Sequence, residues 1–220
     1  MISAWFMALA LAQPLAAKMP DNTLTDAEKK AGWVLLFDGK SLAGWNGDPG
    51  VWRVEDGAIS GKALKVAANT FLIREGEFSD FILEVDGMLI PGRGFTNSGI
   101  QYRSRIDDAK TWRVAGYQAD IGDGWWGTLY DEKGRGVLAR PTRAGKKAAK
   151  MGEWFHYKIS AVQAELDLTL NGVLAITFND RNARARRLSG VIALQYHAPG
   201  EGFEIRFKNI KLRRVGKKTQ

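Results

Sequence analysis

Three segments of the sequence carry pairs of polar residues at a spacing of two. The pairs are Gln101 and Arg103 in NSGIQYRSR, Gln118 and Asp120 in GYQADIG, and Gln195 and His197 in LQYHAPG. In a β-strand, residues i and i+2 point to the same face, and turn-forming sequence follows each pair within a few residues. We therefore expect the three pairs to form one polar floor near the end of a sheet. Such a floor offers hydrogen-bond donors and acceptors suited to a hydroxyl-rich ligand.

Two adjacent tryptophans, Trp125 and Trp126, follow Asp120 in the glycine-rich stretch GDGWWGT. They could rim the polar floor and offer flat apolar faces to the C–H side of a sugar ring. The alternative is that one indole plugs the end of the fold and the other covers it. His197 titrates near neutral pH and could serve as a base or an acid, whereas we assign no role to His156.

The elements that must position these residues are short strands separated by turn signals. FILEVDGML alternates apolar and polar residues with period two, as a half-buried strand requires. Asp56-Gly57 and Asn171-Gly172 are dipeptides typical of tight hairpin turns, and the broken alternation at Asn209-Ile210 suggests a bulge. We count at least nine strands and no βαβ pattern. The sequence therefore predicts an all-β fold of two antiparallel sheets, a β-sandwich or jelly roll.

The length of 220 residues is compatible with one such domain. Residues 3–12 are apolar and small residues follow at 16–17, so we predict a signal peptide over residues 1–17 and a secreted or periplasmic protein; a lone short apolar helix is the alternative. A polar lead with a short helical patch spans residues 18–31. No run of about 18 apolar residues exists elsewhere, so we expect no membrane span in the mature chain. The absence of cysteine excludes disulfides and thiolate metal sites.

The net charge of +8 is concentrated in the second half of the chain, including a basic tail at residues 216–220. Basic clusters within 146–150, 181–187 and 213–218 could contact phosphate backbones. No nucleic-acid fold motif accompanies them, so we interpret the clusters as a solvated surface and consider nucleic acid an unlikely partner.

Eight segments, including those of the polar pairs, follow one another along the chain. They are GWVLLFDGKSLAGWNG (32–47), VWRVEDGAISGK (51–62), NSGIQYRSR (97–105), GYQADIG (116–122), GEWFHYKI (152–159), LNGV (170–173), GVIALQYH (190–197) and FKNIKLR (207–213). Taken together and in order, they resemble the family of 3-keto-disaccharide hydrolase domains, formerly a domain of unknown function. The resemblance covers about residues 32–215.

The resemblance implies a concanavalin A-like jelly roll that cleaves glycosides already oxidised at C3 of the sugar. A C3 ketone acidifies the C2 proton, so a base can remove it and the C1 oxygen can leave by elimination, with water added afterwards. On this sequence the implied roles are enolate or hydroxyl contacts for Arg103 and Gln101, and proton transfer for His197 or Asp120. Gln118 and Gln195 would orient the substrate, an oligosaccharide or other glycoside.

The sequence departs from the family pattern, because members often carry an acidic residue before the Tyr-Gln of this motif, where Gly116 stands here, and further histidines after its Asp. The alternative function is a non-catalytic carbohydrate-binding module. Two-carboxylate glycoside hydrolysis is disfavoured, since only Glu84 and Asp86 stand where glucanases of this fold carry three acids, and we expect both to face solvent. No metal-binding motif is present and we predict no cofactor, although a cation held by Asp120 and His197 stays open.

Overall fold

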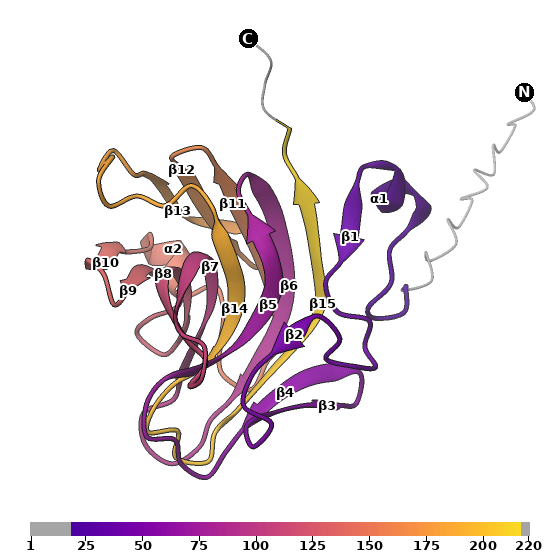
Figure 1. Ribbon diagram of the computed structural model, residues 1–220, viewed down its shortest axis with the longest axis vertical. Coiled ribbons are helices and arrows are strands. Elements are labelled where there is room, and N and C mark those ends of the chain that lie inside the picture. The colour runs from indigo at the N-terminus through magenta and orange to yellow at the C-terminus, as the bar shows by residue number, and fades with distance from the viewer. Residues whose placement is uncertain (1–18, 217–220) are drawn as a thin grey trace, which may run out of the picture.

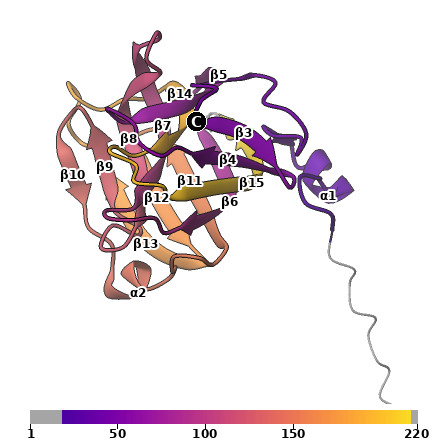
Figure 2. The same cartoon turned by 90° about the horizontal axis from the view of Figure 1, so that it is seen from below.

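Two antiparallel β-sheets account for nearly all regular structure in residues 19–216, the part of the chain that this computed structural model describes (Figures 1 and 2). Sheet A contains β1 (Trp33–Leu35), β3 (Trp52–Glu55), β4 (Ala58–Lys62), β6 (Phe81–Ile90), β11 (Phe155–Val162), β12 (Glu165–Leu170), β13 (Val173–Asn179) and β15 (Glu204–Arg214). Sheet B contains β2 (Trp45–Asn46), β5 (Thr70–Phe78), β7 (Asn97–Asp108), β8 (Arg113–Gly122), β9 (Leu129–Glu132), β10 (Gly136–Ala139) and β14 (Gly190–Tyr196). The two short helices are α1 (Asp26–Lys30) and α2 (Arg143–Lys146).

The strand order is β13-β12-β11-β6-β15-β4-β3 in sheet A, with β1 also paired to β15, and β10-β9-β8-β7-β14-β5-β2 in sheet B. Neighbours in space are therefore often distant in sequence, as in a jelly roll. Helix α1 and β1 lie beside β15, at the opposite side of the molecule from β9, β10 and α2 (Figure 1). The predicted all-β sandwich is confirmed.

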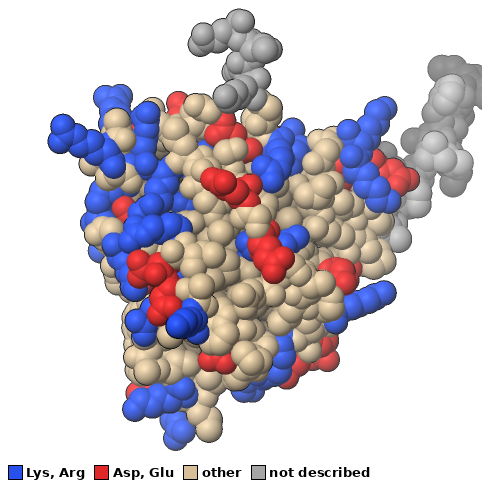
Figure 3. All heavy atoms as spheres, in the orientation of Figure 1, with Lys and Arg blue, Asp and Glu red and all other residues tan. Residues whose placement is uncertain are grey.

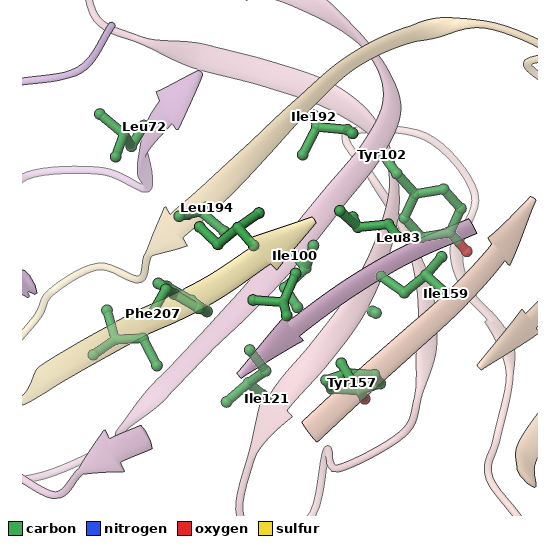
Figure 4. Packing of buried hydrophobic residues seen from close by; sticks show 14 of the residues in the cluster. Leu72, Leu83, Ile100, Tyr102, Ile121, Tyr157, Ile159, Ile192, Leu194 and Phe207 are labelled. Atoms are coloured by element: carbon green, nitrogen blue, oxygen red, sulfur yellow. The ribbon is translucent and has the colours of Figure 1, made fainter. Parts of the chain in front are cut away.

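The hydrophobic core lies between the two sheets, because each strand turns alternate residues inward (Figure 4). Strand β6 shows the predicted alternation over its full length. In sheet B the same alternation buries Ile100 of β7, Ile121 of β8 and Leu194 of β14 in the core. The side chains of the residues next to them in sequence therefore point to the outer face of sheet B. These residues are Gln101, Asp120 and Gln195.

The predicted turn signals are confirmed by the backbone. Asp56 and Gly57 join β3 to β4 with φ of 51° and 72°, and Asn171 and Gly172 join β12 to β13 with φ of 48° and 79°. These left-handed values are what a tight hairpin requires. The predicted bulge is also present in β15, whose pairing with β6 shifts between Lys208 and Lys211.

The outer face of sheet A carries an ion network that holds the N-terminal segment. Lys211 of β15 lies 3.0 Å from Glu84 and 2.5 Å from Glu28 of α1, and His156 Nδ1 lies 2.6 Å from Asp86. Glu84 and Asp86 thus lie on the outer face of sheet A, as expected, where these contacts partly bury them.

The predicted signal peptide at 1–17 lies outside the described residues, as does most of the basic tail. The predicted helical patch of the polar lead is helix α1, capped reciprocally by Thr25 and Glu28. In residues 19–216 no helix has the length and apolar character needed to cross a membrane.

Candidate active site

A pocket of about 350 Å³ opens on the outer face of sheet B, a size typical of ligand sites. Five of the residues predicted from the sequence line it. The full lining is Asn69, Phe95, Asn97, Gln118, Asp120, Trp125, Tyr130, Glu132, Gln195 and His197. The polar pairs of β8 and β14 therefore meet in one hollow, as the spacing of two predicts.

Asp120 lies at the bottom of this pocket and is almost fully buried, with 3% of its surface exposed. Its Oδ1 accepts hydrogen bonds from Gln118 Nε2 (3.1 Å) and Asn97 Nδ2 (3.3 Å). Neither donor is charged. Burial disfavours the carboxylate and raises the pKa of Asp120 to about 7, against the smaller opposing effect of these hydrogen bonds. Near neutral pH this side chain can both donate and accept a proton.

Gln195 and His197 supply polar atoms that the protein itself leaves unpaired. Both amide atoms of Gln195 and Nδ1 of His197 are buried without a hydrogen-bond partner in residues 19–216. Burying an unpaired polar group costs about 1–3 kcal/mol, so such atoms in a pocket point to a ligand-binding role. Burial also lowers the pKa of His197, which favours the neutral imidazole. The ring packs edge-to-face against Phe95, with centroids 5.2 Å apart.

Gln101 supports the pocket from beside it rather than lining it. Its Nε2 donates to Gln118 Oε1 (2.6 Å), and Ser104 Oγ donates to Gln101 Oε1 (2.7 Å). These bonds fix which end of the Gln118 amide faces Asp120. The expected ligand contact for Gln101 is therefore replaced by a positioning contact.

Gly99 makes this arrangement possible because Gln118 lies directly over it. A Cβ atom built on Gly99 would stand 2.4 Å from Cδ of Gln118. No side chain larger than hydrogen fits there unless Gln118 moves.

The expectation that Arg103 shares a face with Gln101 is wrong. Arg103 has φ of 47°, and the pairing of β7 with β8 shifts between Tyr102 and Arg105. This bulge rotates the side chain out of the floor. The guanidinium instead donates to the carbonyl oxygens of Ser79 (2.7 Å) and Gln163 (2.6 Å) and pairs with Asp80 at 2.9 Å, where it is fully buried.

The two tryptophans have different environments. Trp126 is 3% exposed and packs edge-to-face on Phe155 of sheet A, so it belongs to the core and is not a rim residue. Trp125 lines the pocket, with the guanidinium carbon of Arg140 5.2 Å from its ring centroid. The structure therefore combines both alternatives: one indole closes the sandwich and the other borders the polar floor.

Five lining residues were not predicted: Asn69, Phe95, Asn97, Tyr130 and Glu132. Tyr130 and Glu132 lie on β9, whose sequence LYDE alternates with period two, so they carried the same signal as the other pairs. Asn97 begins β7 two residues before Gly99, also on this face. Asn69 and Phe95 come from loops, where no periodicity exists to place them.

The pocket contains two carboxyl groups and one imidazole but no metal-ligand cluster. In the described residues no group of three or more His, Cys, Asp or Glu side chains is arranged to hold a metal ion. Asp120 and His197 line the same pocket.

Comparison with known proteins identifies the class of this chain. Residues 32–213 match the family described as the 3-keto-alpha-glucoside-1,2-lyase-like domain. The chain belongs to that family. No curated protein sequence matches it.

Solved structures agree on the fold. A proposed glycosyl hydrolase from Parabacteroides distasonis is 23% identical, with a TM-score of 0.69 over 90% of this chain and 100% of the other. The carbohydrate binding module CBM66 from Bacillus subtilis is 20% identical, with a TM-score of 0.60 over 77% of this chain and 95% of that module. A protein with a galectin-like fold from Bacillus subtilis is 10% identical, with a TM-score of 0.56 over 80% of this chain and 92% of the other. At these identities the likeness concerns the fold alone.

Proposed function

We propose that this protein cleaves the glycosidic bond of 3-keto-glycosides by removing the C2 proton and expelling the C1 oxygen. The observation that carries the proposal is the meeting, in one pocket, of a protonatable carboxyl, a neutral imidazole and an unpaired carboxamide. Family membership supports this reaction class.

The pocket residues divide the chemistry as follows. His197, held neutral by burial, accepts the proton from C2. The electrons of the C2–H bond move toward the C3 carbonyl, whose oxygen becomes an enolate. The Gln195 amide N–H and the protonated Asp120 carboxyl donate hydrogen bonds to that oxygen. Gln195 and Asp120 thereby take the role that the family resemblance implies for Arg103 and Gln101.

A chromogenic 3-keto-glucoside and its unoxidised parent test the proposal. Wild-type protein should release 4-nitrophenol from the oxidised sugar only, because the parent has no acidic C2 proton. His197→Ala should lower the rate by about 10²–10⁴-fold, the usual contribution of a general base. Asp123→Asn, an exposed acid in the β8–β9 loop, is the matched control and should retain full activity. Absence of turnover by the wild type would reject the proposal.

A second candidate function is non-catalytic carbohydrate binding, and Trp125 at the pocket edge favours it. In that case wild-type protein should bind unmodified oligosaccharides without converting 3-keto-glucosides. Titration calorimetry would then show that the wild type binds the oligosaccharide, that Trp125→Ala loses this affinity and that Trp154→Ala keeps it. Trp154 is the appropriate control because it is 40% exposed and lies under Lys208 of sheet A.

We further propose that the protein acts outside the cytoplasm, on the strength of the apolar residues 3–12. N-terminal sequencing of the mature protein from fractionated cells tests this. A mature chain that begins at Met1 in the cytoplasmic fraction would contradict it.

A further inference from the structure

The pocket continues beyond its own rim into two neighbouring hollows. The first, of about 220 Å³, is lined by Ala68, Asn69, Phe71, Arg113, Glu132 and Lys133. The second, of about 350 Å³, is lined by Asp48, residues 65–70 and residues 110–113. Asn69 belongs to the pocket and to both hollows, which also share Ala68 and Arg113. We call these two hollows the outer groove.

Glu132 stands at the boundary between the pocket and the outer groove, since it lines both the pocket and the first hollow. Its Oε1 accepts a hydrogen bond from Asn69 Nδ2 at 3.2 Å. The Glu132 side chain has no ion pair in residues 19–216, and the neighbouring Lys133 pairs with Asp107 at 2.7 Å. Burial raises the pKa of Glu132, whereas salt bridges lower the pKa of the buried acids Asp180 and Glu204.

A glycoside bound in this pocket has one bond that must cross the boundary. On the proposed function, the reacting sugar would occupy the pocket with His197, Asp120 and Gln195. A group attached at C1 could then extend into the outer groove, which would bring the glycosidic oxygen beside the Asn69–Glu132 pair.

Resting on the proposed function, we propose that Glu132 is the general acid that protonates the departing glycosidic oxygen, and that the outer groove holds the leaving group. In this step the C1–O bond breaks and its electron pair goes to the oxygen, which takes the proton of the Glu132 carboxyl. The enolate electrons form the C1–C2 double bond. The C2 proton remains on His197 and Glu132 becomes a carboxylate, and exchange with solvent restores both groups.

The charge of the outer groove further defines the leaving group. Lys65, Lys110 and Arg113 line it and form no ion pair with any carboxylate of the described chain, whereas Asp48 and Glu132 are the acids there. The Trp112 indole also lines it, held by a 2.9 Å hydrogen bond to Asn46. A ring that carries a carboxylate or sulfate fits this combination of stacking surface and positive charge.

Turnover of two substrates with different leaving groups by the variant Glu132→Gln shows whether Glu132 acts as a general acid or as a structural residue. A 4-nitrophenolate leaves without protonation, so turnover of 4-nitrophenyl 3-keto-glucoside should change less than about threefold. A methyl 3-keto-glucoside must be protonated as it leaves, so its turnover should fall by about 10²–10⁴-fold. Full nitrophenyl activity shows that the variant is folded. Glu165→Gln, an exposed glutamate of β12, should affect neither substrate.

Equal losses on both substrates, or no loss on either, would overturn the role of Glu132 while leaving the proposed function intact. If wild-type protein converts neither substrate, the proposed function itself fails, and the two failures are thus separable.

The charge preference has its own test with 4-carboxyphenyl and phenyl 3-keto-glucosides. Wild-type KM should be lower for the carboxylate by roughly 2- to 5-fold, the size expected of a solvent-exposed ion pair. Arg113→Gln should remove the difference in KM between the two substrates, and added salt should reduce it. Equal KM values in the wild type at low salt would reject the anionic leaving group.

Discussion

At the scale of single residues, the chemistry of the pocket depends on uncharged neighbours. Asp120 accepts from two amides and from no arginine or lysine in the described chain. Buried carboxyls elsewhere in the fold are neutralised, as Asp180 is by Arg135 at 2.7 Å. A carboxyl buried without a cation stays protonated to higher pH, which is useful for proton transfer but unfavourable for stability.

Replacing Asp120 should therefore stabilise the protein at alkaline pH. Its folded pKa of about 7 exceeds the unfolded value of about 3.9. The folded state thus binds more protons between these values, and stability falls as pH rises through this window. Asp120→Asn removes the penalty and should raise the free energy of unfolding by roughly 2–4 kcal/mol at pH 8, with little change at pH 4. Urea denaturation at both pH values measures this; equal stability at pH 8 would show that Asp120 ionises without cost.

At the scale of elements, the site depends on two irregularities in β7. Gly99 leaves room for Gln118 to cross the sheet face, and the bulge at Arg103 sends its guanidinium toward the β5–β6 and β11–β12 turns. The first keeps the amide chain of the floor in place. The second joins β7 to the carbonyl of Gln163, in the turn between β11 and β12 of sheet A.

Gly99→Ala should disrupt the floor through a clash with Gln118. We expect a loss of roughly 1–3 kcal/mol of stability, as for an overpacked site, and at least a tenfold loss of turnover. In a Gln118→Ala background the clash partner is gone, so the same substitution should then cost little stability. Thermal unfolding of the four proteins in this cycle gives the coupling. Additive losses would mean that Gly99 acts through something other than Gln118.

Arg103→Ala should destabilise the protein while leaving the chemistry of its folded fraction unchanged. The substitution leaves Asp80, whose side chain is only 11% exposed, without its cation, which costs about 3–5 kcal/mol. Arg105→Ala, two residues along the same strand, removes only an exposed pair with Asp107 and should change stability by less than about 1 kcal/mol. Denaturation measures both variants, and KM measured under native conditions should match the wild type. A large rise in KM for Arg103→Ala but not for Arg105→Ala would show that Arg103 takes part in substrate binding.

Particular residues show how far the sequence predicted this site. Gln118, Asp120, Gln195 and His197 all line the pocket, as predicted. Strands β8 and β14 are regular at the first three positions, and the spacing of two still holds at His197, one residue beyond β14. The prediction that Arg103 shares a face with Gln101 was wrong, because the bulge there depends on partners distant in sequence, such as Asp80 and Gln163. The prediction that Trp126 borders the pocket was wrong, because two adjacent tryptophans in a glycine-rich loop show no periodicity that would indicate which one points inward.

Strand pairing shows which side chain lies beside Gly116, the position where the sequence departs from the expected family pattern. Gly116 of β8 lies opposite Glu132 of β9. The register, which the sequence alone does not give, therefore brings a carboxyl group next to this position.

At the scale of the whole molecule, the pocket is joined to the opposite sheet through the core. Tyr157 of β11 donates to the backbone oxygen of Asp120 (2.8 Å), and the Gly127 amide donates to the Tyr157 hydroxyl (2.9 Å). The position of the floor on sheet B therefore depends on a residue of sheet A. Lys, Arg, Asp and Glu side chains all lie on the face shown in Figure 3.

Tyr157→Phe should loosen this connection. The variant leaves a buried carbonyl and amide unpaired, so we expect a loss of about 1–3 kcal/mol and a measurable rise in KM. Tyr102→Phe is the matched control, since the Tyr102 hydroxyl is buried without a partner in residues 19–216. Its removal should be neutral or stabilising. Calorimetric unfolding of the two variants would contradict the argument if both lost the same stability.

The hydrogen bond from Gly127 to Tyr157 also gives the protein a built-in reporter. That amide can take up deuterium only while the β8–β9 loop parts from the far layer of the sandwich. Its exchange rate would therefore report how readily the floor opens, and a bound sugar should slow the exchange without contacting the amide.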